Sequence, residues 1–72
     1  MENPAYRWRK ATDINREYAL FELLRNEEVI LNVGFSDSDQ FEISFGNRRQ
    51  IFEWEYLQKL IKEGRKLAEM DK

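Results

Sequence analysis

The 72-residue chain contains 42% hydrophobic and 36% charged residues and has a formal net charge of −2. Its length allows one domain, residues 1–72, and its 14% aromatic content excludes a disordered chain, which lacks the apolar side chains that offset conformational entropy. Because it contains neither cysteine nor histidine, disulfides, Cys/His zinc sites, thiol nucleophiles and imidazole bases are excluded together.

The first half of the chain contains two candidate strands. Tyr6–Lys10 alternates aromatic and charged side chains, as an edge strand does. Arg16–Leu24 fits either a strand or a helix beginning near Asp13. We favour the strand, because nine residues make a short helix but a strand of ordinary length. Arg25–Glu28 then forms a tight turn into the next strand.

The middle of the chain predicts an antiparallel hairpin. Val29–Ser36 and Phe41–Phe45 both alternate apolar and polar residues with a period of two, and Ser and Asp residues separate them. Gln50–Phe52 is a candidate for a further short edge strand.

A helix is predicted over 54–70, where apolar residues recur every three or four positions. Gly64 lies within this apolar stripe and would let the helix approach the layer beneath it; a bend in the helix is the alternative. The fold class is therefore α+β: a small antiparallel β-meander of three to five short strands with one C-terminal amphipathic helix packed on one face. The residues expected to form the core are Trp54, Leu57, Ile61 and Leu67 of the helix and Val29, Leu31, Val33, Phe35, Phe41, Ile43 and Phe45 of the sheet.

Enzymatic and metal-binding functions find little support in the sequence. The spacing of Asp37 and Asp39 suggests a calcium loop, but the required glycine is missing and the twelfth position is Arg48. Neighbouring carboxylates occur in a turn and at the helix start, where both have structural explanations. We therefore expect no catalytic residues, no metal and no cofactor.

The cellular location can also be predicted from the sequence. No apolar stretch has the length of a signal peptide or approaches the roughly 20 residues of a membrane span. The sequence begins at Met1 and ends without a linker, so we expect a complete, cytoplasmic gene product.

A small nucleic-acid-binding regulator is one alternative function. Tyr6 and Trp8 alternate with basic residues, and Arg48 and Arg49 would extend a patch suited to stacking and phosphate contacts. No established nucleic-acid-binding motif is present, and the net charge is negative. We favour a structural role, in which both aromatic residues pack on the core and their charged neighbours face water.

The charge distribution favours a protein partner. Residues 18–46 contain six acidic residues and one basic residue, a balance of −5 that could attract a basic partner. The sheet face opposite the helix should combine acidic groups with exposed aliphatic side chains, including Leu24. The residues expected to contact the partner are Glu22, Asp37, Asp39 and Glu42, with Leu20 or Ile30 supplying apolar contact.

We therefore expect a stand-alone, non-enzymatic protein-binding module, for example an inhibitor or immunity-type protein. A homodimer or other homo-oligomeric structural protein is a further alternative. A half-solvated sheet that binds nothing explains the same pattern.

Overall fold

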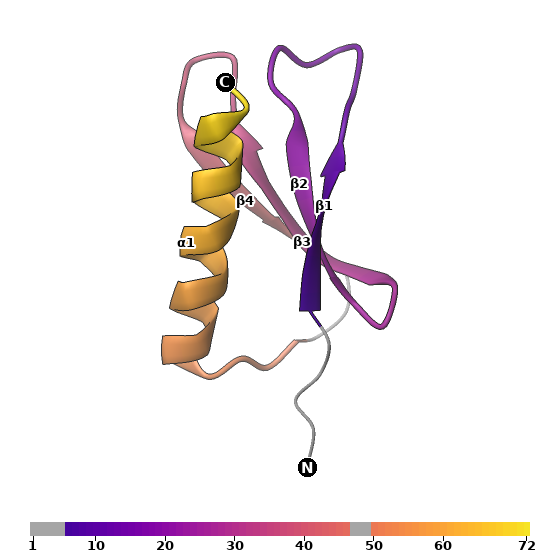
Figure 1. Ribbon diagram of the computed structural model, residues 1–72, viewed down its shortest axis with the longest axis vertical. Helices are drawn as coiled ribbons and strands as arrows, with labels where there is room; N and C mark the ends of the chain where they lie inside the picture. Colours follow the sequence, from indigo (N-terminus) through magenta and orange to yellow (C-terminus); the bar gives the residue numbers. More distant parts are fainter. Residues whose placement is uncertain (1–5, 47–49) are drawn as a thin grey trace.

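A computed structural model describes residues 6–46 and 50–72, in which four antiparallel strands form an open sheet covered on one face by a helix (Figure 1). The strands are β1 (Tyr6–Ala11), β2 (Leu20–Arg25), β3 (Glu28–Phe35) and β4 (Phe41–Phe45), and they lie in the order β1-β2-β3-β4. The helix α1 (Trp54–Met70) follows the last strand. The predicted α+β meander and the predicted helix bounds are confirmed.

The segment Arg16–Leu24, which fitted either a strand or a helix, begins as a loop and continues as β2. The loop begins with a turn in which Asp13 accepts hydrogen bonds from the N–H of Asn15, at its side chain (2.9 Å), and of Arg16, at its backbone carbonyl (3.0 Å). An aspartate at such a position competes with helix formation because its side chain satisfies nearby backbone groups. The helical alternative near Asp13 is therefore wrong, and the strand begins later than Arg16, at Leu20.

The β2–β3 connection is a two-residue turn. Asn26 and Glu27 have φ values of 52° and 66°, and Arg25 pairs with Glu28 across the turn. Two consecutive residues with positive φ are typical of the type I′ turns that match the twist of a hairpin. The predicted tight turn over these four residues is confirmed.

A β-bulge in β3 changes which residues face the helix. Leu24 pairs with Val29, whereas Leu23 pairs with Leu31, so Ile30 is the extra residue. Ile30 is 2% exposed and belongs to the core, while Val29 is 38% exposed. The strict period of two predicted the opposite for both residues, and the bulge is the reason that it was wrong.

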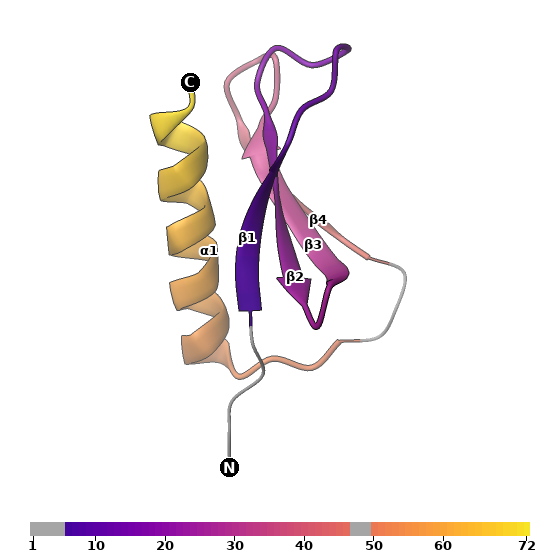
Figure 2. The same ribbon diagram turned by 45° about the vertical axis from the view of Figure 1, so that its right-hand side comes forward.

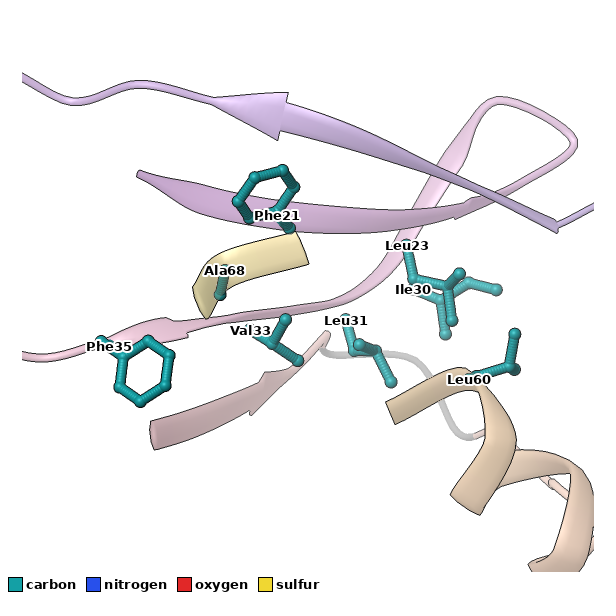
Figure 3. Packing of buried hydrophobic residues seen from close by; sticks show 8 residues of the cluster. All are labelled: Phe21, Leu23, Ile30, Leu31, Val33, Phe35, Leu60 and Ala68. Atoms are coloured by element: carbon teal, nitrogen blue, oxygen red, sulfur yellow. The ribbon is translucent and has the colours of Figure 1, made fainter. Parts of the chain in front are cut away.

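The core lies between α1 and the two central strands. Leu60, Gly64 and Ala68 are the buried residues of α1, and their spacing of four draws one line along the helix. Eight residues form the core, shown together in Figure 3: Phe21, Leu23, Ile30, Leu31, Val33, Phe35, Leu60 and Ala68. The helix covers β2 and β3, and it leaves much of β4 uncovered.

Residues 50–53 form an extended crossing and not a strand. These residues run below the end of the sheet toward the start of α1 (Figure 2). Phe52 lies against Tyr6, with ring centroids 6.4 Å apart, and the N–H of Leu57 donates to the carbonyl of Glu53 (2.9 Å). Because the segment must cross to the helix, it cannot run back along β4, and the predicted edge strand at Gln50–Phe52 is wrong.

Candidate protein-binding surface

The acidic residues of the middle segment lie beside basic residues from the chain ends. Arg9 of β1 is opposite Glu22 of β2, and its guanidinium Nη2 lies 2.7 Å from Glu22 Oε1. Arg7 likewise binds Glu27, at 2.6 Å, and this contact holds the pKa of Glu27 below its usual value. The −5 balance of residues 18–46 therefore does not produce a continuous acidic surface, because β1 places cations along β2 and its turn.

Asp37 and Asp39 lie in the turn between β3 and β4, and most of the contacts there stabilise the turn. Asp39 forms an ion pair with Lys72, and its φ of 65° identifies it as a turn residue. Ser36 Oγ accepts a hydrogen bond from the N–H of Gln40 (3.2 Å), while Asp37 is exposed and has no ion pair among the described residues. The structure thus gives these residues the hairpin-turn role that the sequence favoured over calcium binding.

Leu20 and Glu42 meet on the sheet face opposite the helix. They line a shallow hollow of about 370 Å³ together with Arg16, Asn32 and Ser44. Leu20 is half-buried because it lies over Gly34, where an added Cβ would be 2.9 Å from Leu20 Cδ2. The structure brings this part of the predicted surface together, with a cation, Arg16, at its edge.

Two aliphatic residues predicted for that face are not available to a partner. Ile30 points into the core as a consequence of the bulge, and Leu24 is 1% exposed. The prediction that Ile30 supplies an exposed apolar contact is therefore wrong, as is the prediction that Leu24 is exposed.

The aromatic residues of β1 pack against α1 and against the segment that precedes it. Trp8 contacts Gly64, and the ring of Tyr6 lies 5.6 Å from that of Tyr56. The intervening cations are engaged in ion pairs, those of Arg7 and Arg9 with β2 and its turn and that of Lys10 with Asp71 (2.6 Å). The predicted packing of Tyr6 and Trp8 on the core is confirmed, whereas Arg48 and Arg49 lie outside the described residues.

Exposed apolar side chains that the sequence did not predict occur on β4 and at the start of α1. Trp54 is 69% exposed, Phe45 58% and Ile43 40%, although all three were expected in the core. Trp54 shares one side of α1 with Arg65, whose guanidinium lies 5.5 Å from the ring centroid of Phe41, so this side of the helix faces β4. We call Ile43, Phe45 and Trp54 the β4–α1 surface.

The position of the helix explains why this surface is exposed. α1 is centred over β2 and β3 because Gly64 admits the indole of Trp8, which brings the helix toward β1. A helix drawn toward one edge of a four-stranded sheet cannot also cover the other edge. The small residues Gly64 and Ala68, four apart, mark the line of closest approach and were the available sequence signal.

The two edge strands differ in their protection against further pairing. Across the described residues, β1 and β4 form the edges of the sheet. β1 contains Arg7, Arg9 and Lys10, and charged side chains of this kind discourage pairing with another chain. The sequence of β4, Phe-Glu-Ile-Ser-Phe, has regular alternation and one charge, with neither lysine nor proline. β4 is therefore the edge on which an additional strand could pair.

In the comparisons with known proteins, no family model, no curated protein and no solved structure matches the chain. No helix in the described part of the chain is both long enough and apolar enough to cross a membrane.

Proposed function

We propose that this chain is a protein-binding module whose contact site is the β4–α1 surface together with the free edge of β4. The observation on which the proposal rests is the exposure of Ile43 and Phe45 on an unprotected edge strand, with Trp54 also exposed at the start of α1. Neither feature is needed to complete the core, which the central strands and α1 already form.

Energetics favour an occupant for this surface. Burying an aromatic or aliphatic side chain of this size is worth about 1.5–3 kcal/mol. Ile43, Phe45 and Trp54 together therefore offer a partner several kcal/mol before the costs of association are subtracted. Large aromatic side chains are also the residues most often found at the centres of protein interfaces.

The backbone of β4 adds a second means of recognition. An exposed strand edge can accept a strand from a partner, in which case main-chain hydrogen bonds supply affinity and alternating side chains supply specificity. Glu42 points to the opposite face from Ile43 and is exposed, so it would place a negative charge beside the contact. This role retains one of the acidic residues selected from the sequence.

Site-specific photo-crosslinking tests the proposal. A benzophenone amino acid replaces Phe45 in one variant and Trp54 in another. The matched controls carry it at two exposed positions outside β4, Lys62 of α1 and Thr12 after β1. We expect a discrete crosslinked species from positions 45 and 54, with the partner chain identified by mass spectrometry. Crosslinking at positions 45 and 54 no stronger than at the two controls would contradict the proposed site.

A crosslinked partner must also bind in purified form. Phe45→Lys should weaken that complex by about tenfold or more, since it places a charge in an apolar contact. Lys62→Ala, a change of an exposed helical residue, should leave the affinity unchanged. Equal affinities for the Phe45→Lys variant and the unaltered chain would exclude β4 from the interface.

A further inference from the structure

We propose that the occupant of the β4 edge is a second copy of this chain, paired antiparallel with the first about a two-fold axis through Ile43. This inference rests on the proposed function, because it names the partner of the same surface. The resulting dimer would continue the sheet from four strands to eight, with both helices on the same face.

The backbone of β4 has the polarity that such pairing needs. Two hydrogen bonds frame the strand on its β3 side: the N–H of Ser36 donates to the carbonyl of Gln40 (2.8 Å), and the N–H of Gly46 donates to the carbonyl of Ile30 (2.9 Å). Residues of an antiparallel strand alternate in the direction of their N–H and C=O groups. The even-numbered residues of β4 therefore bond to β3, and the odd-numbered residues direct both groups to the free edge. These odd-numbered residues are Phe41, Ile43 and Phe45.

Pairing about Ile43 satisfies all of these free groups. Ile43 lies opposite Ile43 of the second copy, and Phe41 lies opposite Phe45 of the second copy, so every facing pair that exchanges hydrogen bonds is an odd-numbered pair. Backbone donors and acceptors at an exposed edge are otherwise left to water. The strand is thus self-complementary in its main chain.

The side chains are self-complementary in the same register. The odd-numbered residues are all apolar and lie on the face that includes Val33, and Ile43 and Phe45 are exposed there, so the dimer brings the exposed apolar side chains of both copies together. On the other face, Glu42 lies opposite Ser44 of the second copy, which avoids a pairing of like charges. Shifting the register by two residues would place Glu42 opposite Glu42 of the second copy, and that contact is repulsive.

The position of α1 leaves room for the second copy. The helix packs mainly on β2 and β3 and approaches β1 through Trp8, and it leaves Ile43 and Phe45 of β4 exposed. The β1 edge, with its three cations, is unsuited to the same pairing. Assembly should therefore stop at a dimer instead of continuing into longer sheets.

Opposite charges at one position test the register. Ser44→Glu places a carboxylate opposite Glu42 of the second copy, and Ser44→Lys places an ammonium group there. By symmetry each substitution acts twice in the dimer. Sedimentation equilibrium over a concentration series should show a dimer of the unaltered chain, a dimer about threefold to tenfold weaker for Ser44→Glu, and a tighter one for Ser44→Lys.

The matched controls are Thr12→Glu and Thr12→Lys, which make the same charge changes at an exposed residue beyond β1. They should leave the dimer constant unchanged. Thermal unfolding at concentrations where the chain is monomeric shows whether each Ser44 variant still folds, so that a loss of dimer is not confused with a loss of structure.

Amide hydrogen exchange supplies an independent readout on the unaltered chain. The N–H groups of Phe41, Ile43 and Phe45 should exchange quickly when dilute and become protected as concentration rises. Those of Glu42 and Ser44 should be protected at every concentration, because they bond to β3. Protection that does not depend on concentration at the odd-numbered residues would contradict the pairing.

The outcomes separate this inference from the proposed function. A chain that remains monomeric at millimolar concentration overturns the dimer, while crosslinks from position 45 to a different protein would still support the binding site. A dimer that responds equally to Ser44→Glu and Ser44→Lys overturns the register about Ile43. Crosslinks from position 45 to a second copy, together with opposite effects of the two substitutions, support both.

Discussion

The indole of Trp8 lies against the backbone of Gly64, so close that a Cβ built on Gly64 would be 2.5 Å from Cη2 and 2.7 Å from Cζ2 of the ring. The indole Nε1 is buried and has no hydrogen-bond partner within the described residues, so packing holds this ring in place. The contact joins β1, the first strand, to the last element of the fold. It also sets where α1 lies over the sheet, and thereby which strand remains uncovered.

Gly64→Ala should destabilise the fold, although alanine is the better helix former by about 1 kcal/mol. The added methyl group overlaps a large rigid ring, and overpacking of this kind typically costs about 1–3 kcal/mol. We therefore expect no net gain and a loss of up to about 2 kcal/mol, measured by urea denaturation. In a Trp8→Leu background the ring is absent, and the same Gly64→Ala change should be neutral or stabilising. Additive effects of the two substitutions would contradict the contact.

The sequence predicted the elements well because their signals are local. The helix bounds at Trp54 and Met70, the turn after Arg25 and the hairpin from β3 to β4 follow from periodicity and turn residues within a few positions. The Gly64 prediction also identified a close approach, but it could not name Trp8 as the residue that fills it. That pairing joins residues far apart in the chain, and periodicity contains no such information.

The candidate site was predicted less well, for two physical reasons. The bulge in β3 changes the side of the sheet on which Ile30 and Val29 lie, and no residue type at that point predicts a bulge. The charge balance of a segment also says nothing of its spatial neighbours, and the ion pair of Arg9 with Glu22 comes from strand order. The exposed β4–α1 surface depends on the lateral position of the helix, which a contact between distant residues decides.

Glu27→Gly should raise the stability of the fold. A non-glycine residue in the left-handed region costs about 1 kcal/mol, and Asn-Gly is the preferred pair for a two-residue hairpin turn. The substitution removes that cost and loses an exposed ion pair with Arg7, which is worth less. The control is Glu27→Ala, which loses the ion pair and keeps the backbone strain, and it should lower the stability. Chemical denaturation distinguishes the two, and a Glu27→Gly variant less stable than Glu27→Ala would contradict the turn geometry.

The carboxyl of Glu27 should titrate below its ordinary pKa range, because the guanidinium of Arg7 donates hydrogen bonds to both of its oxygens. The pKa of Glu27 is lowered first by the hydrogen bond from Arg7 and then by the charge of the same guanidinium. Because the folded pKa lies below the unfolded one, the stabilisation is present above the unfolded pKa and disappears as pH falls through the folded pKa. Arg7→Met should raise the pKa of Glu27 toward its ordinary value in an NMR titration. Arg9→Met should raise it less, since Arg9 acts on Glu27 only through its charge.

The bulge in β3 predicts an order of truncation costs that strict alternation reverses. Ile30→Ala removes a side chain that is buried among the core residues and should cost about 2–5 kcal/mol. Val29→Ala should cost under about 1 kcal/mol, because Val29 is exposed on the opposite face. Ile43, expected in the core from its period, is also partly exposed, so Ile43→Ala should cost less than Ile30→Ala. Urea denaturation of the three variants at a concentration that keeps the chain monomeric gives the order directly. A Val29→Ala variant less stable than Ile30→Ala would mean that β3 pairs with β2 without the extra residue, and that Ile30 lies on the outer face opposite Leu24.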